Sequence, residues 1–186
     1  MRKISIAIFA FMLFAGVLSA QESREYTKQY GVYSEEWAKE VIGFMADEKF
    51  NGREAGTKEN YKIMKFIAKE FKKMGLKPEI QKITSESLTA AIGEPRKGKV
   101  YPAKMNNVLA RIEGKNPNML VVVGAHYDHL GVDTTLVGDQ CYNGADDNAS
   151  GVSAVLQLAK AIKKSKKQPE RTIIFAFWDG EEKGFL

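Results

Sequence analysis

The sequence predicts an α/β fold whose sheet contains parallel strands. The chain has 186 residues, of which 44% are hydrophobic and 27% charged, a composition typical of a folded globular protein. Two continuous apolar runs, residues 119–123 and 172–178, have the length and composition of strands buried on both faces. A segment with helical periodicity, residues 151–164, separates them, and the order strand, helix, strand is typical of parallel neighbours.

The first 20 residues have the three regions of a secretory signal peptide. A basic start is followed by an apolar run over residues 4–18, and Ser19 and Ala20 supply small residues before a cleavage position. This run of 15 residues is short for a membrane span, which needs ~20. We therefore expect a signal peptide over residues 1–20, a single domain over 21–186, and a secreted or periplasmic protein without stable membrane insertion. An uncleaved N-terminal anchor is the alternative.

Two amphipathic helices are predicted upstream of the strands. In residues 34–50, Ser34 can cap the first helix, and the apolar residues that recur at helical spacing are Trp37, Val41, Phe44 and Met45. The second helix begins after its cap Thr57 and stops at Gly75, with an apolar stripe of Ile63, Ile67, Phe71 and Met74. The residues between the helices, 51–56, form a turn-rich loop.

Shorter elements complete the expected chain. Residues 79–104 alternate irregularly and predict short strands and turns, and residues 107–112 predict a strand. The lysine-rich end of the last helix, residues 163–167, resembles a nucleic-acid patch. Because lysines are stabilised near a helix C-terminus by the helix dipole, we interpret it as a solvated helix end.

Charge and cysteine content exclude several classes of protein. The single cysteine, Cys141, excludes a disulfide scaffold. A net charge of +5 and a pI near 9.1 would permit a nucleic-acid partner. However, residues 116–159 contain no Lys or Arg, whereas they hold both histidines of the chain and five aspartates. A nucleic-acid surface needs the opposite charge, so we expect no nucleic acid. The acids would repel one another unless they are spread over solvent or share a cation.

The best-placed histidine follows the first buried strand. His126 and Asp128 come just after residues 119–123, at the strand end where α/β sheets present their ligand sites. Residues two apart in an extended chain point to the same side, so the carboxylate of Asp128 can support the imidazole. A hydrogen-bonded loop histidine is the simpler alternative for His126 alone.

Two further pairs of acids stand at the same kind of position. Asp146 and Asp147 precede the helix at 151–164, and Glu181 and Glu182 follow the strand at 172–178. A helix cap explains one carboxylate, and a surface turn could explain the glutamates. Imidazole and carboxylates from three such segments together indicate a divalent metal site. In a Glu-Glu pair, one side chain can bind metal while the other accepts a proton from water.

These motifs, taken in order, resemble the zinc metallopeptidase family M28, the aminopeptidase Y group. The resemblance rests on residues 124–129 (GAHYDH), 144–151 (GADDNASG) and the Glu181-Glu182 pair at a strand end. The loop 51–57 (NGREAGT) and the strand that starts NVLA at 107–110 also look like that family. The match spans residues 34–186. It implies a three-layer α/β sandwich with a mixed, largely parallel central sheet, as in zinc exopeptidases.

The resemblance also implies a role for each site residue. His126 would bind one zinc, Asp147 would bridge two zincs, and Glu182 would bind the second. Glu181 would be the general base that activates water for peptide hydrolysis, and Asp128 would support His126 from behind. His129, Asp146 and Asp179 receive no role. We therefore expect a zinc-dependent exopeptidase, most similar to aminopeptidases, that acts on peptides.

The sequence departs from the family pattern after Glu182. In the family each zinc has a third protein ligand, an Asp and a His that come later in the chain, and this sequence has no histidine beyond His129. We therefore expect the N-terminal portion of a longer enzyme, with weak zinc binding and little activity of its own. Two alternatives stay open: a glutaminyl-cyclase-like acyltransferase with one zinc, and a non-catalytic binding module on the same fold.

Overall fold

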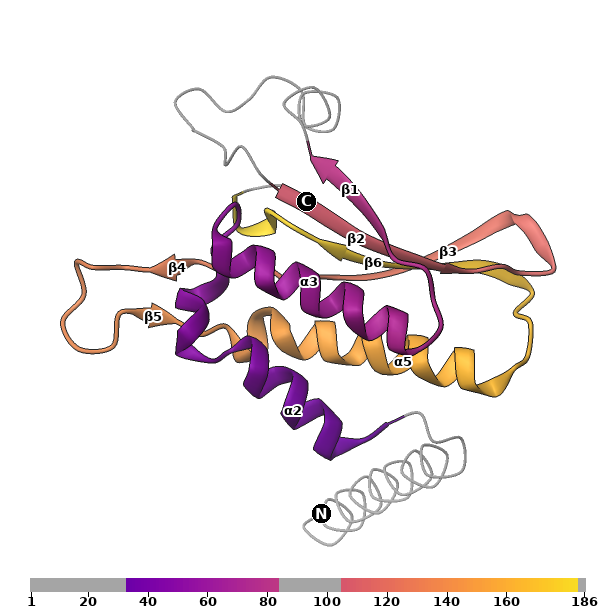
Figure 1. The fold of residues 1–186 in the computed structure, drawn as a ribbon, viewed down its shortest axis with the longest axis horizontal. Coiled ribbons are helices and arrows are strands. Elements are labelled where there is room, and N and C mark those ends of the chain that lie inside the picture. Colours follow the sequence, from indigo (N-terminus) through magenta and orange to yellow (C-terminus); the bar gives the residue numbers. More distant parts are fainter. Residues whose placement is uncertain (1–32, 84–104, 184–186) are drawn as a thin grey trace, which may run out of the picture. The chain divides into compact units, whose positions relative to one another are not determined.

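A computed structural model describes residues 33–83 and 105–183 (Figure 1). The predicted signal peptide and most of the predicted strands and turns at 79–104 lie outside the described residues. Two compact units divide the chain, Met1–Ser34 and Glu35–Leu186, and all the elements described below belong to the second. None of the helices in the described ranges is long and apolar enough to cross a membrane.

The sheet is mixed and has the strand order β1-β2-β6-β3. Its strands are β1 (Glu79–Ile83), β2 (Met105–Ile112), β3 (Asn116–His126) and β6 (Arg171–Trp178). β2 pairs antiparallel with both β1 and β6, whereas β3 and β6 pair parallel. The predicted α/β class and the parallel strand pair around a helix are therefore confirmed. A two-stranded hairpin, β4 (Gly131–Val132) with β5 (Cys141–Tyr142), projects from the end of β3.

The described helices pack into one core against one face of this sheet. They are α2 (Glu35–Met45), α3 (Lys58–Lys73) and α5 (Gly151–Ser165), and Figure 1 shows them grouped on the same side of the strands. The core combines their buried faces with Val108 and Ala110 of β2 and Phe175 and Phe177 of β6. Packing of the helices on the sheet thus fixes the positions of the strand ends.

Helix α3 forms as its sequence predicts. The Thr57 hydroxyl accepts a hydrogen bond from Asn60 N at 3.1 Å, and the predicted stripe residues Ile63, Ile67 and Phe71 are fully buried. Gly75 adopts φ 71°, the left-handed conformation that stops a helix at little cost for glycine.

The predicted helix at 34–50 is instead divided into two elements. α2 ends at Met45, and a 3₁₀ turn, η1 (Glu48–Arg53), follows it. The division occurs because Asp47 has an extended backbone and its carboxylate accepts a hydrogen bond from Lys49 N at 3.0 Å, which starts a new turn.

The prediction that residues 119–123 are buried on both faces is wrong. β3 is an edge strand of the described sheet, and Leu120 and Val122 are 56% and 55% exposed. Both side chains point away from the face that carries Phe175, since Val123 is the residue paired with Phe175. By contrast, β6 lies between two strands, and its residues Phe175 to Phe177 are fully buried, as predicted.

Candidate metal centre

Three segments that are distant in the sequence meet at the ends of β3 and β6. His126 is the last residue of β3 and pairs with Trp178 at the end of β6. Asp147 lies in an irregular turn, η2 (Ala145–Ser150), that leads into α5, and Glu182 lies in a 3₁₀ turn, η3 (Glu181–Lys183), after β6. Because β3 and β6 are parallel, their C-terminal ends share one edge of the sheet, and α5 begins close to that edge.

The three residues predicted as metal ligands come together at this edge. One donor atom from each of His126, Asp147 and Glu182 lies within 4.8 Å of the other two. An imidazole nitrogen and two carboxylate oxygens are donors that zinc accepts. The structure therefore brings the predicted ligands into the reach of a single cation.

The contact between His126 and Asp147 requires a positive charge between the two side chains. His126 Nδ1 lies 3.2 Å from the backbone carbonyl of Asp128, which requires a proton on Nδ1. His126 Nε2 lies 2.9 Å from Asp147 Oδ1. With the proton on Nδ1, a neutral imidazole places two electron-pair donors face to face, so either a second proton or a metal ion must sit between them. The donor set thus fits zinc.

The acidic surroundings favour positive charge on His126. Burial alone would lower the pKa of this imidazole, but the carboxylates of Asp128, Glu181 and Asp147 outweigh it and raise the pKa to about 9. Without a metal, a proton therefore occupies the position between His126 and Asp147 at neutral pH.

Asp128 contacts both His126 and the turn that carries Glu181 and Glu182. The Asp128 carboxylate is fully buried and lies 3.6 Å from His126 Nδ1. Its two oxygens accept hydrogen bonds from the backbone N–H groups of Glu181 and Glu182, each at 3.2 Å. The predicted support of His126 thus comes mainly from the Asp128 carbonyl, while the carboxylate ties the end of β3 to the turn after β6.

Asn148 and Asp147 have different roles: the Asn148 side chain bonds to the start of α5, whereas the Asp147 side chain faces His126. Asn148 Oδ1 accepts a hydrogen bond from Gly151 N at 3.0 Å, as a cap does. Asp146 is exposed, and Asp147 turns its carboxylate towards His126. The peptide bond between Asp147 and Asn148 is cis.

Glu181 lies next to the cluster on the same turn as Glu182. Burial raises the pKa of Glu181, and the negative charges of Glu182, Asp128 and Asp147 add to the increase, whereas His126 opposes it. A raised pKa brings a carboxylate closer to the range in which it exchanges protons at neutral pH.

Arg53 is the main site feature that the sequence analysis missed. Its guanidinium is fully buried and donates hydrogen bonds to backbone carbonyls on both sides of the site: Met45, Tyr127, Asn143, Gly144 and Asp147, at 2.5 to 3.4 Å. Burial lowers the pKa of Arg53 to about 10, so it stays charged at neutral pH. In the sequence, an arginine within a turn-rich loop is typical of a surface residue, and only the resemblance of the loop 51–57 pointed to it.

The turn that presents Arg53 needs its unusual backbone. Asn51, Gly52 and Arg53 all adopt positive φ, at 44°, 61° and 41°. A Cβ on Gly52 would lie 2.2 Å from the carbonyl oxygen of Gly131, so only glycine fits there. The close approach of η1 to the β4–β5 hairpin thus determines where Arg53 enters the site.

Two residues left without a role also make specific contacts. His129 Nδ1 lies 2.7 Å from Glu182 Oε1. Asp179 is 3% exposed and accepts hydrogen bonds from the Asn60 side chain at 3.1 Å and from Asn106 N at 2.9 Å. Burial raises the pKa of Asp179 to about 6. Asp179 therefore anchors the end of β6 to α3 and β2, behind the predicted ligands.

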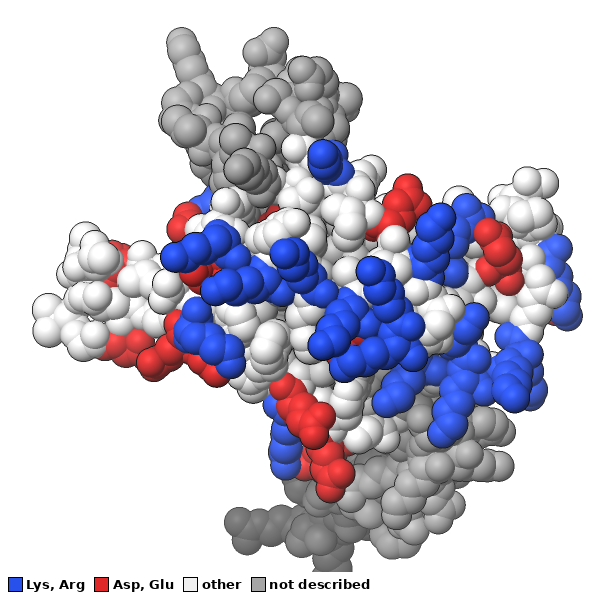
Figure 2. Space-filling model, viewed as in Figure 1, with Lys and Arg blue, Asp and Glu red and all other residues white. Residues whose placement is uncertain are grey.

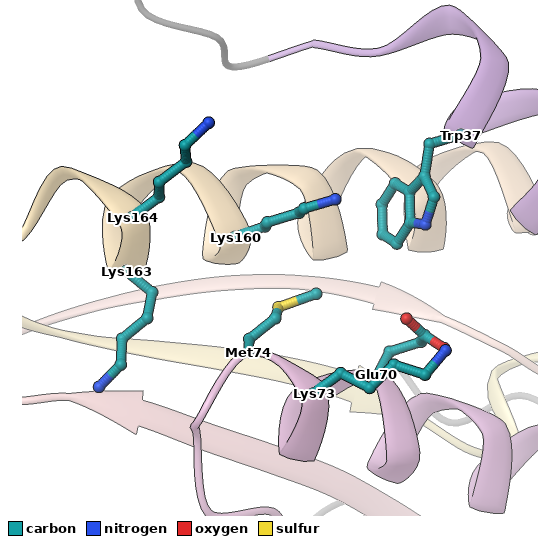
Figure 3. A pocket seen from close by; sticks show the side chains of 7 residues that line it. All are labelled: Trp37, Glu70, Lys73, Met74, Lys160, Lys163 and Lys164. Atoms are coloured by element: carbon teal, nitrogen blue, oxygen red, sulfur yellow. The ribbon is translucent and has the colours of Figure 1, made fainter.

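A concave surface lies away from this cluster, between α2, the end of α3 and the second half of α5 (Figure 3). Its wall carries four lysines, Lys73, Lys160, Lys163 and Lys164. Figure 2 shows that lysines extend over this side of the molecule, along α3 and the end of α5, whereas the β4–β5 hairpin shows only acidic and uncharged residues in this view. A positive surface repels a divalent cation, so this concave surface is less suited to a metal ion than the acidic edge at His126.

Part of this chain is similar to known metalloproteases. Residues 107–186 match the model of Peptidase family M28. A "Probable zinc metalloprotease" from Pyricularia oryzae is 36% identical over 85 residues, which are 45% of this chain and 16% of that protein. This chain therefore spans only a small part of that curated relative.

Solved structures show the same fold at low identity. A Porphyromonas gingivalis glutaminyl cyclase aligns with a TM-score of 0.64 and 19% identity, over 81% of this chain and 49% of that one. A leucine aminopeptidase precursor from Bacteroides thetaiotaomicron aligns with a TM-score of 0.56 and 20% identity, over 80% and 48% of the two chains. This chain thus has the same α/β fold as these structures, and its residues 107–186 match peptidase family M28.

Proposed function

We propose that this chain carries the metal site and the general base of a zinc-dependent exopeptidase. We propose further that this exopeptidase is an aminopeptidase, because its motifs resemble those of the aminopeptidase Y group. The observation that supports this most directly is the convergence of His126, Asp147 and Glu182 on one point, with donor atoms within 4.8 Å, beside a glutamate whose pKa is raised. The substrates would be peptides, as the names of the metalloprotease and aminopeptidase relatives suggest.

In this proposal His126, Asp147 and Glu182 would hold zinc, and Asp147 would be the ligand shared by two ions if two are bound. When bound, zinc supplies a Lewis acid that polarises a peptide carbonyl and acidifies water. Glu181 accepts the proton of the attacking water and passes it to the leaving amine. The Asp128 carboxylate accepts hydrogen bonds from the backbone N–H groups of both glutamates. These bonds hold the turn that carries the general base and the neighbouring ligand.

Zinc affinity and hydrolysis test the two roles separately. Glu182→Ala should weaken zinc binding, measured by competition with a chromophoric chelator, whereas Glu181→Gln should leave it near that of the unmodified chain. Any hydrolysis of amino-acyl anilides should fall by about 10²–10⁴-fold in Glu181→Gln, as expected for loss of a general base. Hydrolysis that persists in Glu181→Gln would contradict the assignment.

The number of zinc ions is part of the proposal. Two ions sharing Asp147 would bind with a stoichiometry of about two per chain, in line with paired-metal hydrolases. Three ligands around one point could equally serve a single zinc, since catalytic zinc sites often have three protein ligands. Metal content measured after dialysis against buffered zinc decides between these stoichiometries.

A glutaminyl-cyclase-like activity is the second candidate, because glutaminyl cyclases are among the structures with the same fold. Such an enzyme would cyclise an N-terminal glutamine instead of hydrolysing a peptide. The Asp147-Asn148 pair favours the peptidase. Incubation with a glutaminyl peptide and an alanyl peptide distinguishes them, since only a peptidase releases a free amino acid from the alanyl peptide.

We also propose that the protein acts outside the cytoplasm, as one domain beginning after residue 20. The basic and apolar pattern of residues 1–20 supports this, and the related aminopeptidase structure is named a precursor. Sequencing the N-terminus of the protein recovered from its native host tests the proposal. A mature chain that begins at Gln21 is expected, whereas a chain that retains Met1 in the cytoplasm would contradict it.

A further inference from the structure

We propose that His129 is a positioning residue that holds Glu182 in the orientation needed to bind zinc. The inference rests on the proposed function, because Glu182 is one of the ligands of that site. His129 Nδ1 lies 2.7 Å from Glu182 Oε1, and the two side chains are only 10% and 15% exposed. A short, largely buried contact to one carboxylate oxygen limits how the whole carboxylate can rotate.

The imidazole of His129 is itself held in place. Its backbone N–H donates to the carbonyl of Arg53 at 3.3 Å, and its ring meets the ring of Tyr142 edge-on at 6.4 Å between centroids. A Cβ on Gly144 would lie 2.5 Å from His129 Cδ2, so the ring packs directly against the glycine backbone. A ring that is confined in this way can impose its orientation on a flexible glutamate.

Two parallel contacts connect this region to the turn that carries Glu182. Glu54 and His129 are joined by a β-bridge, and each reaches a different residue of that turn. His129 contacts Glu182, while Lys183 Nζ lies 2.5 Å from Glu54 Oε1. One contact therefore ends on a proposed metal ligand and the other on its neighbour, which provides a matched control.

The contact between His129 and Glu182 is of the kind that orients a metal ligand without touching the metal. An N–H at Nδ1 of His129 donates to Glu182 Oε1 and leaves the second carboxylate oxygen available to a cation. It also removes rotational freedom that Glu182 would otherwise lose when zinc binds. Removing such a partner typically weakens metal binding by about 10- to 100-fold.

The test compares zinc dissociation constants of the full chain and three variants. His129→Leu should bind zinc about 10- to 100-fold more weakly. His129→Asn should recover most of the affinity, because its side-chain N–H₂ can donate from nearly the same position as Nδ1. Lys183→Met should bind like the unmodified chain. Circular dichroism and thermal unfolding establish that each variant is folded.

A second measurement asks whether His129 acts through Glu182. In a Glu182→Ala background, His129→Leu should cause no further loss of zinc affinity. A further loss of the same size would overturn the proposal, because His129 would then bind the metal directly. An unchanged affinity in His129→Leu, or an equal loss in Lys183→Met, would overturn it as well. If the unmodified chain itself binds no zinc, the proposed function fails, and this role fails with it.

Discussion

Replacing Arg53 with methionine tests whether one buried cation organises the metal site. Arg53 is fully buried and donates to the carbonyls of Met45, Tyr127, Asn143, Gly144 and Asp147. Methionine fills a similar volume without a donor, so several carbonyls lose their partner at once. Each unsatisfied buried group costs about 1–3 kcal/mol, although water and small shifts recover part of the loss.

We expect Arg53→Met to lower the free energy of unfolding by about 3–5 kcal/mol, because the losses at several unsatisfied carbonyls add up. This is a large share of the roughly 5–15 kcal/mol that stabilises a typical domain. Arg53→Lys should recover little of it, because a compact ammonium cannot reach carbonyls on several segments. Urea unfolding, followed by tryptophan fluorescence, measures the change.

Arg111→Met is the matched control. Arg111 lies on the surface of β2, where its side chain is 55% exposed and pairs with Glu113 at 2.8 Å. Losing an exposed ion pair should cost about 0–1 kcal/mol. If Arg53→Met costs no more than this control, the guanidinium does not hold the segments of the site together, and the reasoning is refuted.

Three further predictions follow from the site. Burial raises the pKa of Asp179 to about 6 from 3.8, so folding is favoured while Asp179 is protonated, and the free energy of unfolding falls by about 3 kcal/mol as pH rises from below 4 through 6. Asp179→Asn should abolish this pH dependence of the free energy measured by urea unfolding, and an unchanged pH dependence would contradict the prediction. Zinc must displace a proton from His126, whose pKa is about 9, so apparent zinc affinity should rise with pH up to about 9; a flat profile between pH 6 and 9 would argue against His126 as a ligand. Gly52→Ala should destabilise the chain by more than 1 kcal/mol, since φ is 61° and a Cβ would collide with Gly131 O; thermal unfolding like that of the parent would refute the steric argument.

The sequence predicted the elements whose causes are local. Thr57 and Gly75 bound α3 by capping and by a left-handed stop, which depend on residues within one helical turn. The parallel strands on either side of α5 followed from the order of apolar segments. Burial of residues 119–123 was predicted wrongly, because an apolar run does not reveal whether a strand lies at the edge of a sheet.

The chain by itself also determined which residue types stand at strand ends, and so which side chains were candidates for metal binding. Only the tertiary structure decided that His126, Asp147 and Glu182 come together, that Arg53 donates to the carbonyl of Asp147, and that His129 contacts Glu182. The hydrogen bonds among them join Arg53 to Asp147, 94 positions away, His129 to Glu182, 53 away, and His126 to Asp147, 21 away. Such contacts depend on how strands and turns pack in three dimensions, which no local pattern of residues encodes.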